Sequence, residues 1–407
     1  MKCRSCHSLK IHDFVDLGHA PLSNAYLSES DLDKPEKYYP LKTIVCGDCW
    51  LVQTEDYLNV DEIFKSDYAY FSSTSSSWLK HAQEFSKSVI NKFHIDKNSM
   101  VIEIASNDGY LLKNFVEAKI PCLGIEPTES TARVAESKGI TTKQIFFTEE
   151  SALKLVQEGF MADLVIGNNV YAHVPDINDF TRGLKVILKP DGVITLEFPH
   201  FLELMINKQF DTIYHEHFSY LSLNTIIKIF HSAGLTVVDV EKVPTHGGSL
   251  RIYGKHIEKN DKPSDAVMKI ISEEIAYGLC NIDVYKKFQS TIFKVKYDLL
   301  QFLVNQKNDN KKVVGYGAAA KGNTLLNFAG IKTDLIESVF DANVRKQGKY
   351  LPGSHIPILN PEKMLKSSFD FVIIFPWNLE KEIYSYLRSF LPYKVKILTA
   401  LPRIKFL

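Results

Sequence analysis

The sequence lacks an excess of charge of either sign, and it lacks any long apolar run. Its 407 residues carry 48 Lys and Arg against 48 Asp and Glu, so the formal net charge is zero. Because nucleic-acid binders usually present a basic surface, we expect no nucleic-acid partner, although one local anion pocket remains compatible with this balance. No apolar stretch reaches the roughly 18 residues that a membrane-spanning helix needs, so we also expect no membrane partner.

Cysteine is scarce, and a secretory signal pattern is missing. Six cysteines are too few for a disulfide framework in a chain of this size. The segment from Met1 to Cys6 is polar where a signal peptide would turn apolar. We therefore expect a cytoplasmic protein with reduced thiols, and a monomer. The composition, with 45% hydrophobic and 24% charged residues, is that of a globular protein, and the length predicts two or three domains.

Strand and helix patterns alternate over most of the chain, whereas residues 1–60 show few periodic segments and are predicted to be loop-rich. After an amphipathic helix between Trp78 and Phe93, the alternation predicts a doubly wound α/β unit over residues 95–255. A mostly helical stretch at 262–308 leads into a second α/β unit. The predicted strands lie at 100–104, 122–125, 164–166, 192–197, 312–315, 338–340, 371–375 and 395–398, with helices at 110–118 and 131–138.

Four of the six cysteines form two CxxC pairs near the start of the chain, Cys3 with Cys6 and Cys46 with Cys49. Each CxxC turn points two sulfurs at one ion, and two such turns complete a tetrahedral zinc site with no open coordination position. The pairs lie farther apart than in a compact zinc finger. A redox CxxC usually stands beside a βαβ pattern, which is missing here. The pairs therefore predict a structural zinc ion.

The first strand of the first α/β unit runs into a turn of small and polar residues, EIASNDG from Glu103 to Gly109. Small residues let a ligand approach the backbone beside a helix N-terminus, but the GxGxxG pattern of a pyrophosphate cradle is absent. Glu126 ends the next strand, where a carboxylate accepts hydrogen bonds from ribose hydroxyls. A nucleoside without a pyrophosphate fits this pattern, and S-adenosylmethionine is one. The residues assigned to this cofactor are Glu103, Ala105, Asn107, Asp108, Gly109, Glu126 and Asn168.

A second group of residues carries proton-active side chains. Asn168 and His173 follow the third strand, at the sheet edge where ligands bind in open α/β folds. Further along, Tyr214-His215-Glu216-His217 places four such side chains in a row. The segment is not an HExxH zinc motif. If it is extended, His215 and His217 share a face, which leaves a metal pair open, but a His base steered by a carboxylate is the simpler interpretation.

The second α/β unit begins with a glycine-rich turn, GYGAAAKGN from Gly315 to Asn323. It matches GxGxxA, a variant of the dinucleotide fingerprint, and Asp341 closes the next strand. One interpretation is therefore an NAD-dependent oxidoreductase that acts on a nucleotide sugar. The same elements would hold any nucleoside diphosphate, with backbone N–H groups and Lys321 against the phosphates.

In this order, the motifs resemble those of the nucleotide-sugar C-3 methyltransferases of deoxysugar biosynthesis, over essentially the whole chain. The resemblance rests on the CxxC pairs, the EIASNDG turn, the YHEH segment, the GYGAAAKGN turn, and two polar loops, from Tyr68 to Ser73 and from His246 to Arg251. It implies an α/β protein with an N-terminal zinc-binding module (1–65), a central Rossmann-like S-adenosylmethionine-dependent methyltransferase domain (66–255), and a helical connection with a C-terminal Rossmann-like domain that binds the sugar nucleotide (256–407). Methyl transfer is thereby favoured over oxidoreduction.

The resemblance also implies the chemistry. The substrate would be a nucleoside-diphosphate-linked 4-keto-6-deoxy sugar, with dTDP, GDP and CDP all open. His217 matches the family's proposed base, Tyr214, Tyr68 and His173 match residues that stabilise or position an enolate, and Glu216 matches one that orients its neighbours. The residues assigned to the sugar nucleotide are Tyr70, His246, Arg251, Tyr316, Lys321 and Asn323. A zinc-ribbon nucleic-acid module remains a third class of protein, which the zero net charge disfavours.

Overall fold

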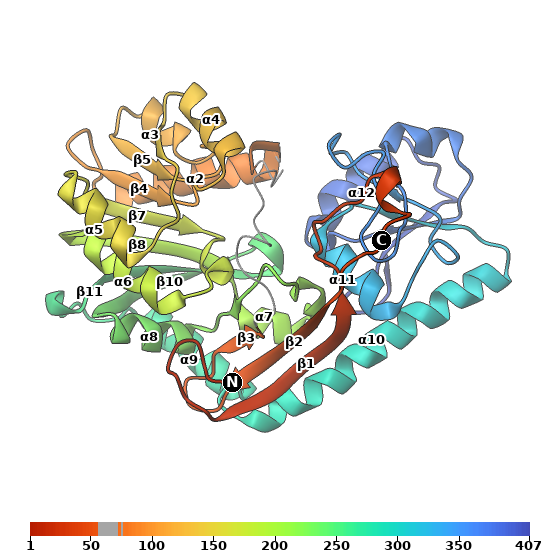
Figure 1. Cartoon of the computed structure of the whole chain (residues 1–407), viewed down its shortest axis with the longest axis horizontal. Helices are drawn as coiled ribbons and strands as arrows, with labels where there is room; N and C mark the ends of the chain where they lie inside the picture. The colour runs from red at the N-terminus through yellow and green to blue at the C-terminus, as the bar shows by residue number, and fades with distance from the viewer. Residues whose placement is uncertain (56–71, 75) are drawn as a thin grey trace.

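The computed structural model describes residues 1–55, 72–74 and 76–407, which form three sheets (Figure 1). The first sheet is antiparallel, with the order β1-β2-β3-β9. Its strands are β1 (Ile11–Ala20), β2 (Tyr39–Cys46), β3 (Val52–Thr54) and β9 (Ser219–Tyr220), the last contributed by the central part of the chain.

The prediction that residues 1–60 are loop-rich is wrong for this sheet. The pairing of β1 with β2 shifts register between Asp13 and Val15 and again between Asp16 and His19. Such bulges insert residues that break the alternation of buried and exposed side chains, and alternation is the pattern by which a strand is recognised from sequence. The strand is therefore present, although its period of two is interrupted.

The second sheet has the order β10-β11-β8-β7-β4-β5-β6, and its five strands from β8 to β6 are parallel. The predicted strands and helices of the first α/β unit are confirmed, but β6, β10 and β11 were missed. The strands are β4 (Val101–Ile104), β5 (Cys122–Ile125), β6 (Thr141–Lys143), β7 (Ala162–Asn168), β8 (Leu188–Pro199), β10 (Leu235–Val243) and β11 (Ser249–His256). The helices are α2 (Ser76–Lys92), α3 (Lys113–Glu117), α4 (Glu129–Ser137), α5 (Glu149–Gln157), α6 (Ile177–Ile187), α7 (Phe201–Ile206) and α8 (Leu223–Ser232).

Helices cover both faces of this sheet (Figure 1). Successive residues of a strand point to opposite faces, and accordingly Val101 packs in one buried cluster with α2 and α3, while Ile102 packs in another with α6 and α8. Both residues are fully buried. This is the doubly wound architecture that the sequence predicts, and it places the carboxyl ends of β4, β5, β7 and β8 at one edge.

The third sheet, with the order β14-β13-β12-β15-β16-β17, is parallel except for β17. Its strands are β12 (Val313–Tyr316), β13 (Val339–Phe340), β14 (Ile358–Leu359), β15 (Phe371–Ile374), β16 (Lys396–Thr399) and β17 (Lys405–Phe406). The helices of this part of the chain are α9 (Asp265–Tyr277), α10 (Ile282–Asn308), α11 (Ala320–Ala329) and α12 (Glu380–Arg388). Among the described residues, no helix has both the length and the hydropathy for crossing a membrane.

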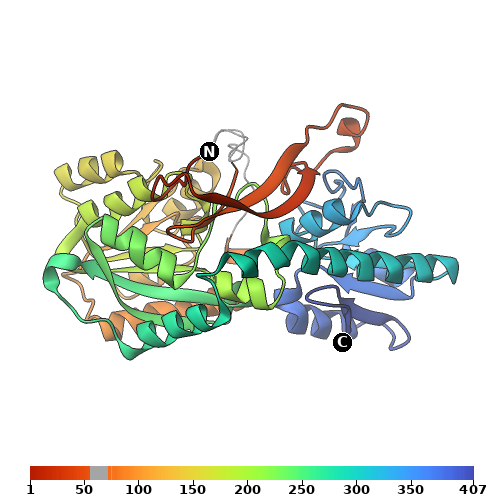
Figure 2. The same ribbon diagram turned by 90° about the horizontal axis from the view of Figure 1, so that it is seen from below.

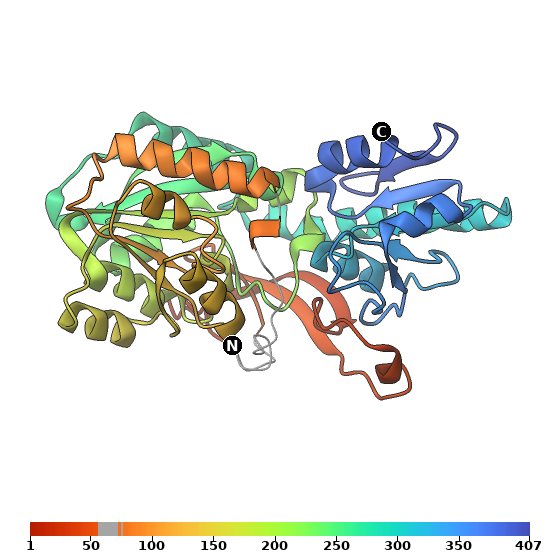
Figure 3. The same ribbon diagram turned by 90° about the horizontal axis from the view of Figure 1, so that it is seen from above.

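Two long elements run from the central unit to the C-terminal unit, the β1–β2 hairpin and α10 (Figures 1 and 2). They pack against each other, with the Phe14 ring stacked on the Phe288 ring at 5.2 Å. The loop beyond β1, which holds the short helix η1 (Glu29–Asp31), lies beside the C-terminal unit (Figure 3). There Leu27 and Tyr350 exchange backbone hydrogen bonds of 3.0 and 2.9 Å.

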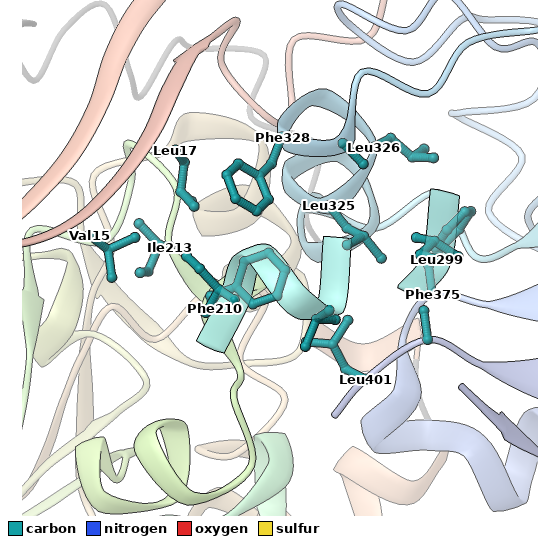
Figure 4. Close-up of a cluster of buried hydrophobic side chains, with 14 of the residues drawn as sticks. Val15, Leu17, Phe210, Ile213, Leu299, Leu325, Leu326, Phe328, Phe375 and Leu401 are labelled. Carbon is teal, nitrogen blue, oxygen red and sulfur yellow. The ribbon is translucent and has the colours of Figure 1, made fainter. Parts of the chain in front are cut away.

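The hairpin, α10 and α11 meet in a buried apolar cluster, called here the joint (Figure 4). The loop around the short helix η4 (Phe210–Thr212) inserts Phe210 and Ile213 into it, and neither side chain is exposed to solvent. The labelled members are Val15, Leu17, Phe210, Ile213, Leu299, Leu325, Leu326, Phe328, Phe375 and Leu401. The joint therefore ties one loop of the central unit to the C-terminal unit.

The turn after β4 provides a stability test. Gly109 has φ +73°, and a Cβ there would meet Ile140 Cδ1 and lie 3.2 Å from Ala135 Cβ. We expect Gly109→Ala to lower the free energy of unfolding by about 3 kcal/mol, through left-handed strain together with overpacking. Gly139→Ala is the matched control, because Gly139 has φ +79° with nothing within 4 Å of its Cβ position, and it should cost only about 1 kcal/mol. Equal losses in urea unfolding would contradict the packing argument.

Candidate functional site

The four cysteines of the CxxC pairs come together at the base of the hairpin. Cys3 Sγ lies 3.5 Å from Cys49 Sγ, Cys6 Sγ lies 3.5 Å from Cys46 Sγ, and all four sulfurs lie within 4.8 Å of one another. A tetrahedral zinc ion with Zn–S bonds of about 2.3 Å requires sulfur separations of about 3.8 Å. The backbone N–H groups of Asp48 and Cys49 approach Cys46 Sγ at 3.4 and 3.5 Å, which favours a thiolate. The donor set fits structural zinc.

The turn after β4 is bent sharply by residues with positive φ. Ala105 has φ 57°, Asn107 has φ 50° and Gly109 has φ 73°. Glu126, at the end of β5, accepts hydrogen bonds of 2.9 Å from the N–H groups of Asn107 and Thr128. The carboxylate assigned to a ribose thus also holds the turn that faces it.

Buried carboxyl groups surround this turn. Glu103 is 1% exposed and Asp108 is fully buried, and Glu103 Oε2 and Asp108 Oδ1 have no hydrogen-bond partner among the described residues. Burial, followed by the negative charges of Glu126 and Asp108, raises the pKa of Glu103 well above its ordinary value. Orphaned acceptors of this kind fit a ligand that brings hydroxyl and amino donors, as S-adenosylmethionine does.

Two of the predicted cofactor residues also hold the described residues that precede α2. Asn107 Oδ1 accepts a 2.9 Å hydrogen bond from the N–H of Ser72, and Asp108 accepts from the Ser73 hydroxyl. Lys138 Nζ lies 3.5 Å from Asp108 Oδ2. The turn is therefore braced from α4 and from the segment that leads into α2.

The carboxyl end of β7 brings two asparagines to the same edge of the sheet. The side-chain amide atoms of Asn168 and Asn169 are buried and have no partner among the described residues. Asn169 has φ 54°, and its N–H donates a 2.7 Å hydrogen bond to the Glu197 carbonyl. Asn168 was predicted, and Asn169 now joins it as a second unfilled amide beside the short helix η3 (Tyr171–His173).

The YHEH segment forms a turn instead of an extended strand, because the His217 N–H donates a 2.9 Å hydrogen bond to the Tyr214 carbonyl. The expectation that His215 and His217 share a face is therefore wrong. The ring of His217 lies 4.0 Å from that of Tyr214 and 4.6 Å from that of His173. His215 turns away and donates from Nε2 to the Pro40 carbonyl at 3.1 Å. The turn thus excludes a metal pair of the two histidines and gathers Tyr214, His217 and His173.

The tautomer of His217 follows from one hydrogen bond. Its Nδ1 lies 2.8 Å from the Thr212 carbonyl, which can only accept, so Nδ1 carries a hydrogen and Nε2 has the free lone pair when the ring is neutral. Burial, followed by the charge of His173, holds the pKa of His217 well below its ordinary value of 6.5. Burial likewise lowers the pKa of His173 to about 4. Both rings are therefore neutral near pH 7.

Glu216 contacts the β1–β2 hairpin and its connecting loop, called here the N-terminal arm. The sequence did not predict this contact. Asn24 Nδ2 lies 2.9 Å from each carboxylate oxygen of Glu216. Asn24 is in turn contacted by the Tyr26 hydroxyl, which donates at 2.6 Å to the Ala318 carbonyl. No motif marks Asn24, because only the tertiary path of the hairpin brings it beside Glu216. Tyr68 and Tyr70 lie outside the described residues.

Lys321, at the first turn of α11, reaches the same region. Its Nζ donates a 2.9 Å hydrogen bond to Asn378 Oδ1 and lies 4.4 Å from the centre of the Trp377 ring. Its charge contributes, after burial, to the lowered pKa of His246, which is about 4, and to that of His217. The structure therefore brings Lys321 and His246 close to the cluster of Tyr214, His217 and His173, although these residues come from different parts of the chain.

Three residues assigned to the sugar nucleotide make contacts within the fold. Arg251 donates to Glu197 at 2.6 Å and lies over the Phe85 ring at 4.4 Å. Asn323 is 1% exposed and donates to the Ser23 carbonyl at 3.1 Å. Tyr316 is 6% exposed and belongs to the apolar core behind the third sheet. Their side chains are largely used by the fold, which sequence motifs cannot reveal.

The Arg251 contact belongs to a network around Glu197. Burial opposes ionisation of this carboxyl, but hydrogen bonds and charges from His81 and Arg251 lower its pKa to about 2. His81 Nε2 lies 2.9 Å from Glu197 Oε2, and the Thr245 hydroxyl donates to Oε1 at 2.8 Å. This network joins α2 to the end of β8, at the sheet edge that carries the site.

The GxGxxA turn is packed against protein. A Cβ on Gly315 would meet the Phe375 ring, one on Gly317 would meet the Pro376 ring, and one on Gly322 would lie 2.7 Å from Phe375 Cβ. The acid expected at the dinucleotide ribose, Asp341, accepts a 2.7 Å hydrogen bond from the Ala318 N–H. The glycines make room for the chain after β15, so the geometry speaks against a dinucleotide cradle.

Known protein families match most of the chain. Three family models match: "Putative zinc binding domain" at residues 3–64, "Methyltransferase domain" at 78–240 and "C-methyltransferase C-terminal domain" at 244–402. The C-methyltransferase NovU of Streptomyces niveus is 33% identical over 401 residues, which cover 98% of this chain and 95% of NovU.

Solved structures also match parts of the chain. The magnesium protoporphyrin IX methyltransferase ChlM of Synechocystis PCC 6803, solved with bound SAH, is 16% identical with a TM-score of 0.35, covering 43% of this chain and 82% of ChlM. The 1,6-didemethyltoxoflavin-N1-methyltransferase of Burkholderia thailandensis is 13% identical with a TM-score of 0.36, covering 51% and 94%.

The family models, the relative NovU and the four gathered cysteines define an S-adenosylmethionine-dependent methyltransferase with a zinc-binding module. The chain belongs to the C-methyltransferase family, of which NovU is a relative. The predicted α/β architecture, S-adenosylmethionine and structural zinc are thereby confirmed. The alternative of an NAD-dependent oxidoreductase has no support in these matches.

The zinc site can be tested by removing one ligand. We expect Cys46→Ser to reduce bound zinc from about one ion per chain to almost none and to lower Tm by about 10 °C or more, because the ion closes the base of the hairpin. Zinc is measured by elemental mass spectrometry. The control is Cys280→Ser, since Cys280 is exposed and lies outside the cluster. Unchanged zinc content in Cys46→Ser would contradict the assignment.

Proposed function

We propose that the protein transfers a methyl group from S-adenosylmethionine to C-3 of a nucleoside-diphosphate-linked 4-keto-6-deoxy sugar. The observation that carries the proposal is the buried His217, whose Nδ1–H is bound to the Thr212 carbonyl and whose Nε2 is therefore free to take a proton. Methylation at carbon needs such a base, because the carbon must lose a proton before it can attack. The 4-ketone of the sugar acidifies the proton on C-3.

In the proposed reaction, His217 removes the C-3 proton, and charge develops on the ketone oxygen. Tyr214 and His173, whose rings lie beside His217, stabilise or position the enolate. We assign the same role to Tyr68, as the resemblance to the family implies. S-adenosylmethionine supplies an electrophilic methyl group on a sulfonium. Glu216, held by Asn24, orients its neighbours.

We assign the binding roles as follows. The β4 turn with Glu103, Glu126 and Asn168 holds the cofactor, and the C-terminal unit holds the sugar nucleotide. Lys321 contacts the diphosphate, and His246 lies near both Lys321 and His217, because after burial the charge of Lys321 lowers the pKa of His246 and the charge of His246 lowers that of His217. On this proposal, residues 1–65, 66–255 and 256–407 are the zinc-binding, methyltransferase and sugar-nucleotide domains, Tyr70 contacts the sugar nucleotide, and the product enters deoxysugar biosynthesis.

The substrate is tested by incubating the enzyme and S-adenosylmethionine with a panel of dTDP-, GDP- and CDP-linked 4-keto-6-deoxy sugars. We expect one of them to gain a single methyl group by mass spectrometry, and C-3 deuterium to be lost from a labelled substrate, because the base must remove that hydrogen. The matching 4-hydroxy sugars are the control, since without a ketone C-3 is not acidic. A panel in which no sugar gains a methyl group would overturn the proposal.

The base is tested with His217→Asn and His217→Ala. We expect kcat to fall by about 100-fold or more, because neither Asn nor Ala offers a basic nitrogen at the position of Nε2, while calorimetric binding of S-adenosylmethionine is retained. His231→Asn, an exposed change in the last turn of α8, is the control and should behave as the parent enzyme. Full turnover in either His217 variant would remove His217 from the mechanism.

The pH profile follows from the pKa shifts. Because burial lowers the pKa of His217, the base is neutral at pH 7 and is lost only as the pH falls through that lowered pKa. We therefore expect the acidic limb of kcat/KM to lie below pH 6.5, the ordinary histidine value. The Tm measured across the same range separates this limb from unfolding. An acidic limb at or above pH 6.5 would contradict a buried, neutral base.

A further inference from the structure

Trp377, in the loop after β15, lies between two parts of the proposed site. The Lys321 ammonium lies 4.4 Å from the centre of the Trp377 ring. Gly247 lies against the same indole, because a Cβ placed on Gly247 would clash with the Trp377 ring. The Gly247 carbonyl accepts a 2.8 Å hydrogen bond from Gln209 Nε2. The indole therefore contacts both Lys321 and the loop that contains His246 and Gly247, so a shift of the indole would move both.

Asp211 fixes this indole. The Trp377 Nε1–H donates to Asp211 Oδ2 at 2.7 Å, and the Asp211 residue is 1% exposed. Asp211 Oδ1 has no partner among the described residues. The next residue along the chain, Thr212, supplies the carbonyl that sets the tautomer of His217. One short helix, η4, thus contacts the C-terminal unit through Asp211 and the base through Thr212.

Asp211 also acts on Lys321 by its charge. Burial lowers the pKa of Lys321 to about 8, and Asp211 opposes this effect. In return, burial raises the pKa of Asp211 to about 6, and Lys321 opposes that. Lys321 in turn acts on His217 and His246, which are both neutral near pH 7. Asp211 is therefore the negative charge that keeps the buried ammonium protonated.

We propose that Asp211 is a positioning residue for the methyl-transfer reaction, and that it acts through Trp377 to hold the Lys321 ammonium against the diphosphate of the sugar nucleotide. The proposal rests on the proposed function. The indole lies between the Asp211 carboxylate and the Lys321 ammonium, so the two do not pair directly. Among the described residues no carboxylate forms an ion pair with Lys321, and its hydrogen bond goes to the neutral amide of Asn378. Lys321 therefore remains available to an incoming anion.

Two variants separate the charge of Asp211 from its hydrogen bond. Asp211→Asn keeps an acceptor for the indole but removes the charge, so Lys321 loses its proton at lower pH. Trp377→Phe keeps an aromatic ring under the ammonium but removes the N–H. Asp341→Asn is the control, because Asp341 contacts the turn before α11 without acting on the Lys321 charge. All variants are assayed as the full chain on the sugar that the parent enzyme methylates.

We expect Asp211→Asn to move the alkaline limb of kcat/KM down by about one pH unit and to raise KM for the sugar nucleotide about tenfold at pH 8, where a charged contact is lost, with a smaller change in kcat. Trp377→Phe should raise KM without moving that limb. An alkaline limb unmoved in Asp211→Asn, or moved equally in Asp341→Asn, would overturn the proposal, as would a parent-like KM in Trp377→Phe.

A measurement without substrate distinguishes failure of this inference from failure of the proposed function. A titration of ¹⁵N-labelled lysine side chains by NMR, with Lys321→Arg to assign the signal, reports the pKa of Lys321 directly. We expect that pKa to be lower in Asp211→Asn than in the parent and unchanged in Asp341→Asn. An identical Lys321 titration in Asp211→Asn and parent would refute the role of the Asp211 charge, whichever sugar the enzyme accepts.

Discussion

The apolar joint is the contact on which the site depends. The loop from Phe210 to Ile213 inserts its two apolar ends into the joint, and between them Asp211 accepts from the Trp377 indole and the Thr212 carbonyl accepts from His217. Truncating a phenylalanine as deeply buried as Phe210 costs about 3–5 kcal/mol, a large share of the ~5–15 kcal/mol that stabilises a typical domain. Apolar burial therefore fixes the loop whose Thr212 carbonyl orients the ring of His217, the proposed base.

The N-terminal arm also contacts the candidate site, through Asn24. The zinc site closes the hairpin at one end, Glu36 Oε2 lies 2.8 Å from His355 Nε2 at the other, and Asn24 contacts Glu216 in between. A single partly exposed polar contact adds little stability alone, so the arm is held mainly by Phe14 and its aromatic neighbours on α10. The structural metal and the reacting groups are thus connected by one continuous piece of chain.

Local sequence patterns were sufficient for features that depend on local chemistry. The CxxC pairs, the EIASNDG turn and the buried strands of both α/β units were predictable, because spacing and hydrophobic runs report directly on ligation and burial. Patterns failed where the outcome depends on distant packing. The bulges of β1 disguised a strand, Phe375 and Pro376 filled the GxGxxA turn, and a β-turn reversed the expected faces of His215 and His217. Asn24, Asp211 and Trp377 carry no motif at all, since each gains its role only from the path of another segment.

The site is assembled from positions as far apart as Asn24 and Trp377. Domains usually fold from the N-terminus as the chain leaves the ribosome, and the zinc cluster, complete once Cys49 has emerged, can form early. His217, the proposed base, cannot meet Lys321 and Trp377 until almost the whole chain has been synthesised. A nascent chain with only its first α/β unit folded therefore has the cofactor turn but lacks the C-terminal part of the site. On the proposed function, a chain whose synthesis stops before Lys321 lacks the part of the site that holds the sugar nucleotide, so the order of translation separates folding of the first α/β unit from activity.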